Sequence, residues 1–179
     1  MSVHIDKWRQ RRVGWPGMPL RCHGVISFCL VIFSFLQTLF LAPVIAVEAV
    51  QRRAGHCLAL NLYWEARSEG REGMIAVGWV VLNRVKHAEF PDAVCAVIRQ
   101  GGETPPCAWS WWCDGKSDQP RNTEAWTRAQ RLARRLLGNP PPDPTRGALW
   151  FHHVSVKKPA WAPHYKRTIR IGKHIFYRK

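Results

Sequence analysis

A glutamate on the apolar face of a predicted helix is the side chain in this sequence best suited to acid–base chemistry. A helix is predicted over Gly55–Ser68, and Leu58, Leu62 and Glu65 share one of its faces by the i, i+4, i+7 rule. A carboxyl on such a face is expected to be withdrawn from water, which raises its pKa. Glu65 could then keep a proton near neutral pH and deliver it to a poor leaving group, as cleavage of a glycosidic bond requires.

The neighbours of this glutamate allow two interpretations. Tyr63 and Trp64 would add aromatic surface around the Glu65 carboxyl. A buried structural ion pair with Arg84 or Arg67 is the alternative, because such pairs also perturb pKa values. The helix pattern by itself favours the ion pair.

Glu69 lies one turn beyond Glu65, so the two Cβ atoms should be about 5–6 Å apart. It could raise the pKa of Glu65 by like-charge repulsion, or it could be a solvated helix end. Two carboxyls on one helix face are poorly placed to hold a sugar from opposite sides. Glu65 would therefore act alone with substrate assistance, or with a partner from elsewhere.

Further helices must position this residue. The sequence predicts a buried helix over Arg71–His87, in which Gly78 permits close packing, and a short helix over Asp92–Arg99. Residues 101–121 are irregular. The clearest helix is Thr123–Leu137, with Asn122 or Thr123 as its cap and an apolar stripe opposite four arginines.

The C-terminal part changes to strand patterns. Ala148–His153 is predicted as a strand, and Thr168–Ile171 and His174–Tyr177 flank a tight turn at Gly172 and Lys173. The fold class is therefore α+β, mainly helical with a small C-terminal antiparallel sheet, preceded by an N-terminal hydrophobic helix.

The N-terminus has the composition of a targeting segment. Residues 1–23 contain five Lys or Arg, and Gly24–Val47 contains no charged residue, which is long enough to span a membrane as a helix. Residues 1–49 are thus predicted to be a basic segment with a signal peptide or a signal anchor, with the N-terminus inside. Residues 50–179 would form the exported domain, in the periplasm or cell envelope. Residues 24–47 would hold it in the inner membrane if the segment is an uncleaved anchor.

Charge and cysteines restrict the partners of the exported part. Residues 1–49 contain five of the 27 Lys and Arg and two of the 12 Asp and Glu. The exported part therefore has 22 basic and 10 acidic residues, which gives it a net charge of +12. An anionic partner is expected, and export makes peptidoglycan carboxylates or anionic lipid better candidates than nucleic acid.

Four exported cysteines suggest two disulfides, with three possible pairings. A zinc site at Cys107 and Cys113 with a histidine is the alternative.

Four segments of the sequence share a pattern with a known family. They are Tyr63-Trp64-Glu65-Ala66-Arg67-Ser68-Glu69, Val81-Leu82-Asn83-Arg84-Val85, Cys107-Ala108-Trp109-Ser110-Trp111-Trp112-Cys113-Asp114-Gly115 and Ile171-Gly172-Lys173-His174-Ile175-Phe176-Tyr177. Through them the sequence resembles the SleB-type cell wall hydrolase family, known from spore-cortex-lytic enzymes, over about residues 56–178. Two departures are Ser68, where the family favours glycine, and Ala108, where it favours glutamine.

The resemblance implies a fold similar to lysozyme-like lytic transglycosylases and a reaction at peptidoglycan. The glycan strand would be cut between N-acetylmuramic acid and N-acetylglucosamine, with Glu65 as the single general acid and base, and with no metal or other cofactor. Closure of a 1,6-anhydro ring on the muramic acid would complete the transglycosylase version. The Ala108 departure puts binding or specificity in doubt.

Eight residues are candidates for substrate binding. Trp109 and Trp111 could stack on sugars or belong to the core, and Ser110 and Asp114 could bind hydroxyls or form turns. The full candidate set is Glu69, Asn83, Trp109, Ser110, Trp111, Asp114, His152 and Tyr177. Histidines of this part are otherwise expected to be structural or surface groups.

Two other functions stay open. One is an N-acetylmuramoyl-L-alanine amidase, which in its common types uses zinc. The other is a non-catalytic cationic wall-binding module, for which the arginine face of Thr123–Leu137 is the feature to consider. The sequence favours the glycan-cleaving enzyme, acting as a monomer on peptidoglycan without a nucleic-acid partner.

Overall fold

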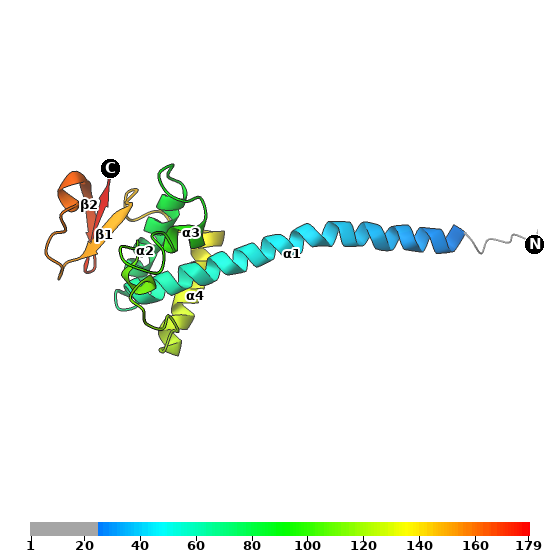
Figure 1. Ribbon diagram of the computed structural model, residues 1–179, viewed down its shortest axis with the longest axis horizontal. Coiled ribbons are helices and arrows are strands. Elements are labelled where there is room, and N and C mark those ends of the chain that lie inside the picture. The colour runs from blue at the N-terminus through cyan, green and yellow to red at the C-terminus, as the bar shows by residue number, and fades with distance from the viewer. Residues whose placement is uncertain (1–24) are drawn as a thin grey trace, which may run out of the picture. The chain divides into compact units, whose positions relative to one another are not determined.

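The computed structural model describes residues 25–179, and for residues 25–45 it describes the backbone alone (Figure 1). Ile45–Lys179 forms one compact unit, which contains the whole of the predicted exported domain and is described here by itself. The basic segment 1–23 lies outside the described residues, as do the side chains of most of the predicted membrane segment 24–47. No helix in the searched part of the chain is long and apolar enough to cross a membrane.

The first helix, α1 (Val25–Ala66), is longer than predicted. It does not begin at Gly55, because the residues from Val47 to Arg53 include no Gly or Pro and are mostly good helix formers. It ends at Ala66 rather than at Ser68. Gly70, which has a φ of 67°, follows and turns the chain into α2 (Gly70–Val85).

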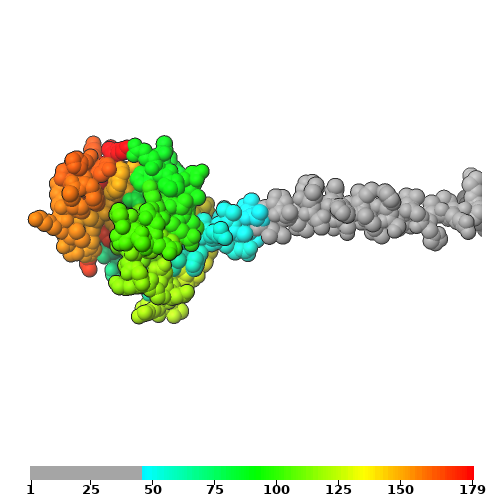
Figure 2. Space-filling view, viewed as in Figure 1, coloured from blue at the N-terminus to red at the C-terminus, as the bar shows by residue number. Residues whose placement is uncertain are grey.

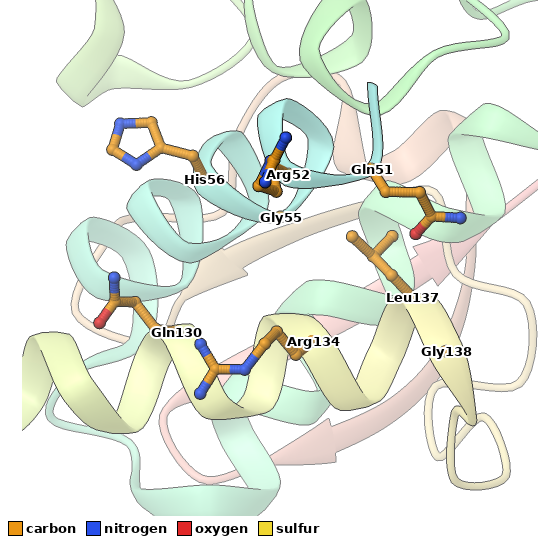
Figure 3. Close-up of a pocket in the computed structure, with 8 residues that line it drawn as sticks. All are labelled: Gln51, Arg52, Gly55, His56, Gln130, Arg134, Leu137 and Gly138. Atoms are coloured by element: carbon orange, nitrogen blue, oxygen red, sulfur yellow. The ribbon is translucent and has the colours of Figure 1, made fainter. Parts of the chain in front are cut away.

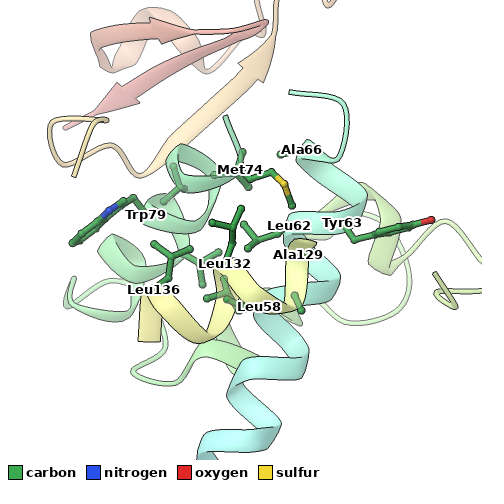
Figure 4. Packing of buried hydrophobic residues seen from close by; sticks show 14 of the residues in the cluster. Leu58, Leu62, Tyr63, Ala66, Met74, Trp79, Ala129, Leu132 and Leu136 are labelled. Atoms are coloured by element: carbon green, nitrogen blue, oxygen red, sulfur yellow. The ribbon is translucent and has the colours of Figure 1, made fainter. Parts of the chain in front are cut away.

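The core lies where α1 and α2 meet α4 (Thr123–Gly138), as Figure 4 shows. Leu58 and Leu62 of α1 are fully buried, as is Met74 of α2. Gly78 on α2 meets Leu136 of α4 so closely that an added Cβ would overlap the leucine, which confirms the predicted close packing. α2 is therefore the central helix, as its apolar sequence indicates.

Local signals at the second half of the chain are also confirmed. Asn122 caps α4, with its Oδ1 accepting a hydrogen bond from the Ala125 N–H at 2.8 Å. The short helix α3 (Val94–Ile98) is only one turn long, and the segment that follows is irregular apart from a 3₁₀ turn, η1 (Ser110–Trp112).

A three-stranded antiparallel sheet completes the domain. β1 (Trp150–His153), β2 (Lys166–Ile171) and β3 (His174–Arg178) are arranged in the order β1-β3-β2, with a second 3₁₀ turn, η2 (Ala162–His164), before β2. The predicted hairpin at Gly172 is confirmed. β3 lies in the centre and brings Phe176 into the helical core.

Two disulfides connect these elements. Cys57 of α1 is bonded to Cys95 of α3, and Cys107 is bonded to Cys113 within the irregular segment, on either side of η1. The second bond uses both sulfurs that the alternative zinc site would need as thiolates, so the structure does not show that site.

Candidate functional site

Glu65 occupies the last turn of α1 and is half-buried. Burial raises the pKa of its carboxyl from 4.5 to about 7, and the positive charge of Arg84 opposes this rise. The same helix face carries Leu58 and Leu62 into the core, so the helix period itself brings the carboxyl toward the interior. At neutral pH a large fraction of Glu65 therefore keeps its proton.

Arg84 is the nearest opposite charge, but it does not form the ion pair that the sequence allows. Its Nε donates a hydrogen bond to the Leu149 carbonyl at 2.8 Å, and its guanidinium lies 5.1 Å from the ring of Phe90 and 4.9 Å from that of Trp109. Burial lowers the pKa of Arg84 to about 10, against the effect of Glu65. Among the described residues, no ion pair within 4.0 Å involves Glu65.

Arg67, the other arginine that the sequence offers as an ion-pair partner for Glu65, also points away from it. Its guanidinium lies 4.9 Å from the ring centroids of both Tyr63 and Trp64. The interpretation of Glu65 as half of a structural ion pair is therefore wrong. Its carboxyl is perturbed by burial while it stays free of a salt bridge.

A cleft of about 300 Å³ opens onto Glu65. Its walls come from the helices, from the segment around residue 109 and from the sheet region. In Figure 2 the green surface of residues near 110 adjoins the orange surface of residues 150–165. The lining residues are Glu65, Arg84, Ala108, Trp109, Ser110, Phe151, His152, His153, Val156 and His174.

Three of the predicted substrate-binding residues line this cleft with Glu65. Ser110 is exposed and can reach a ligand. His152 is half-buried, and its ring nitrogens already have partners, Nδ1 the His153 carbonyl at 3.0 Å and Nε2 the Tyr177 hydroxyl at 3.1 Å. Trp109 is 3% exposed, and its Nε1 donates to the Val97 carbonyl at 3.2 Å. Trp109 is therefore mainly a core residue that contributes an edge to the cleft. Ala108, at the departure from the family pattern, lies beside it.

Trp111 and Asp114 lie in a neighbouring pocket of about 590 Å³. Trp111 is buried, with its Nε1 donating to Asn61 Oδ1 at 3.1 Å, whereas Asp114 is exposed and pairs with Lys116 at 3.5 Å. The other residues around this pocket are Tyr63, Trp64, Arg67, Ser117, Asp118 and Arg121.

The remaining candidates have structural partners and do not line the Glu65 cleft. Asn83 Nδ2 donates to the Ala148 carbonyl at 3.1 Å and to Asp143 Oδ2 at 3.0 Å, which attaches the chain before β1 to α2. Glu69 Oε2 accepts a hydrogen bond from the Lys173 N–H at 2.7 Å in the hairpin turn. Tyr177 is buried and contributes its hydroxyl to a 3.1 Å hydrogen bond with His152 Nε2.

The sheet contributes three cleft residues that the candidate set lacks. They are Phe151, His153 and His174, and the last two face each other in the β1–β3 register. His174 is buried, its Nδ1 has no hydrogen-bond partner within the described part of the chain, and burial lowers its pKa. The signal that could have found them is the pairing of β1 with β3, which puts alternate residues of both strands on one face.

A further pocket, of about 440 Å³, lies between α1 and α4 (Figure 3). Arg52, His56 and Arg134 give it a basic character, and its lining includes no carboxyl group. In the described residues no three His, Cys, Asp or Glu side chains are grouped so that they could hold a metal ion. Of the three pockets described, the Glu65 cleft is the one lined by a carboxyl whose pKa burial raises to about 7.

Comparison with known proteins gives consistent results. A family profile described as Cell Wall Hydrolase matches residues 68–177, more than half of the chain. The spore cortex-lytic enzyme of Halalkalibacterium halodurans is 34% identical over 119 residues, which is 66% of this chain and 33% of that protein. The enzyme of the same name from Bacillus subtilis is 32% identical over 119 residues, again 66% of this chain and 35% of that protein.

Two solved structures are also similar. The catalytic domain of the germination-specific lytic transglycosylase SleB from Bacillus anthracis matches with a TM-score of 0.55 and 31% identity, over 70% of this chain and 93% of that one. The catalytic domain of the Bacillus cereus SleB protein matches with a TM-score of 0.53 and 31% identity, over 70% and 91%. The chain therefore has the fold of these catalytic domains, whereas it spans only about a third of the length of the curated relatives named above.

Proposed function

Because the chain belongs to the cell wall hydrolase family, we propose that it cleaves peptidoglycan glycan strands between N-acetylmuramic acid and N-acetylglucosamine, with Glu65 as its general acid and base. The observation that carries this proposal is a carboxyl with a pKa near 7 in an open cleft, without a salt bridge. The relatives described as spore cortex-lytic enzymes and as a lytic transglycosylase support the same class of substrate.

Glu65 serves first as the acid. Its proton passes to the bridging oxygen as the bond from that oxygen to C1 of the muramic acid breaks and positive charge develops on the sugar ring. A carboxyl with an ordinary pKa would be ionised at pH 7 and could not supply this proton. Burial at the end of α1 provides the protonated fraction.

A single-carboxylate mechanism is favoured by the composition of the cleft. Two-carboxylate glycosidases require a second Asp or Glu about 5–9.5 Å from the first. Of the described residues that line the cleft, Glu65 alone has a carboxyl group. This supports attack by a group of the substrate itself.

The C6 hydroxyl of the muramic acid is that group. Its oxygen forms a bond to C1, and its proton returns to the Glu65 carboxylate, so the acid is regenerated and no water is consumed. The products are a 1,6-anhydromuramic end and a free 4-hydroxyl on the N-acetylglucosamine. Ser110, which is exposed in the cleft, would hydrogen-bond the sugars, and His152 and the edge of Trp109 would give them ring surface.

We retain export as part of the proposal, with residues 24–47 as signal peptide or membrane anchor and peptidoglycan outside the cytoplasmic membrane as the substrate. The basic domain would be drawn to this polyanionic material by its charge.

Digestion of purified peptidoglycan tests the proposal. The full-length chain should release anhydromuropeptides, detected by mass spectrometry, and Glu65→Gln should release none. Glu72→Gln, at the exposed first turn of α2, removes a carboxyl outside the cleft and should leave cleavage intact.

Three outcomes would contradict the proposal. Release of free peptides, abolished by EDTA, would indicate the amidase. Binding to peptidoglycan without cleavage would indicate the cationic wall-binding module. Full activity of Glu65→Gln would remove the role given to this residue.

A further inference from the structure

The pocket of about 590 Å³ next to the catalytic cleft has features of a built recognition site. We call it the arginine–aromatic pocket; its defining residues are Tyr63 and Trp64 of α1, Arg67 just after that helix, and Asp118 and Arg121 of the loop opposite. Its volume is about twice that of the Glu65 cleft and falls within the range of small-ligand sites.

Hydrogen bonds hold the two walls of this pocket together. The Tyr63 hydroxyl accepts from the backbone N–H groups of Arg121 and Asn122, both at 3.1 Å, and Trp64 Nε1 donates to the Asp118 carbonyl at 3.2 Å. These contacts fix a loop of little regular structure against the end of α1. The backbone positions from which its charged side chains extend are thereby fixed before any ligand arrives.

Two arginines in this pocket make no close ion pair with any residue that the structure describes, although Asp114 and Asp118 also line it. In the part of the chain that the structure describes, neither Arg67 nor Arg121 has an ion-pair partner within 4.0 Å, whereas Arg128 has Glu124 at 3.3 Å. The contact of Arg67 with Tyr63 and Trp64 holds the guanidinium by cation–π attraction and leaves its charge in place.

Both walls of the pocket are formed by residues that are close in sequence to residues of the Glu65 cleft. Trp64 in the last turn of α1 and Arg67 just after that helix flank Glu65, and Trp111 follows Ser110 in η1. By the helix period Glu65 points away from Tyr63, so the cleft and the pocket open on different sides of this segment. A stem peptide of four residues spans about 13 Å when extended, which is enough to pass around the end of a helix about 10 Å wide from a strand bound at Glu65.

We propose that the arginine–aromatic pocket binds the carboxylates of the stem peptide that peptidoglycan carries on muramic acid. Guanidinium groups match carboxylates in a bidentate geometry, and the aromatic rings offer apolar surface to the peptide's aliphatic parts. Asp118, which has no ion pair among the described residues, provides an acceptor for an amine of the same peptide. This inference rests on the proposed function, because it assigns part of the same substrate.

The test compares two substrates with the full-length protein. One is intact peptidoglycan, and the other is the same glycan after its stem peptides have been removed by an amidase. The parent protein should cleave the intact strands about tenfold faster at low substrate concentration, the effect of one good charge-assisted contact. The variant Arg67→Gln/Arg121→Gln should lower that ratio to about one.

A matched control removes two arginines from another surface. Arg131→Gln/Arg135→Gln, on the exposed face of α4, changes the net charge equally and should keep the parent ratio. Equal rates of the parent on both substrates, or an unchanged ratio in the pocket variant, would overturn the inference while leaving the glycan-cleaving function intact. A parent protein that cleaves neither substrate would instead contradict the proposed function, and this inference with it.

Discussion

The raised pKa of Glu65 should be measurable as a pH-dependent cost to stability. An unfolded chain releases this proton near pH 4.5, whereas the folded protein keeps it to about pH 7. In this window the folded state binds more protons than the unfolded state, so this group makes stability fall as pH rises. A rise in pKa from 4.5 to about 7 corresponds to about 3 kcal/mol, present as a penalty above pH 7 and absent below pH 4.5.

Glu65→Gln removes this titration while it preserves the shape of the side chain. The free energy of unfolding of the variant minus that of the parent should therefore increase by about 3 kcal/mol between pH 4 and pH 8. Urea unfolding followed by tryptophan fluorescence at unit pH steps gives both values, and titrations common to the two proteins cancel in the difference.

Glu72→Gln is the matched control, since it removes a carboxyl from the exposed start of α2. The difference in free energy of unfolding between Glu72→Gln and the parent should change far less between pH 4 and pH 8. A Glu65→Gln difference that stays constant with pH would show that burial does not perturb this carboxyl. The argument for a protonated acid at neutral pH would then be refuted.

Three further predictions concern activity and the supports of the cleft. The rate of anhydromuropeptide release should fall as pH rises above about 7, because Glu65 loses its proton; a rate that stays level to pH 9 would contradict this. Replacing Cys57 and Cys95 by serine should lower the free energy of unfolding by about 4 kcal/mol, from the loop of 38 residues that the disulfide closes, measured in urea. Gly172→Ala should cost about 1–2 kcal/mol in the same assay, because φ is 55° there and the new Cβ would overlap the Glu69 carboxylate; an unchanged midpoint would exclude the strain.

The features that sequence could predict are those encoded by neighbouring residues. The cap and apolar stripe of α4, the tight turn at Gly172 and the apolar face that carries Glu65 all depend on spacings of a few positions. The choice between an acid and an ion pair for Glu65 was not among them. It depended on where Arg84 directs its guanidinium, which is set by Leu149 and Trp109 from distant segments together with the nearby Phe90.

The same reason explains the residues of the cleft that were missed or misplaced. His174 enters the cleft because β3 pairs with β1, a long-range register that short patterns do not encode. Asn83 resembles a polar site residue in the sequence, but its amide is used by Asp143 and Ala148, about 60 positions away. The disulfide pairing likewise became unique only when α1 and α3 were brought together.

The bond between Cys57 and Cys95 also bears on when the proposed enzyme becomes active. Thiols stay reduced in the cytoplasm and are oxidised outside it. A newly made chain would therefore lack the tie between α1 and α3 until it crosses the membrane, at a cost that is a large fraction of the stability of a small domain. Oxidation on arrival would then couple maturation of a lytic activity to the compartment that holds its target, and the producing cell would be spared a fully folded wall-cutting enzyme before secretion.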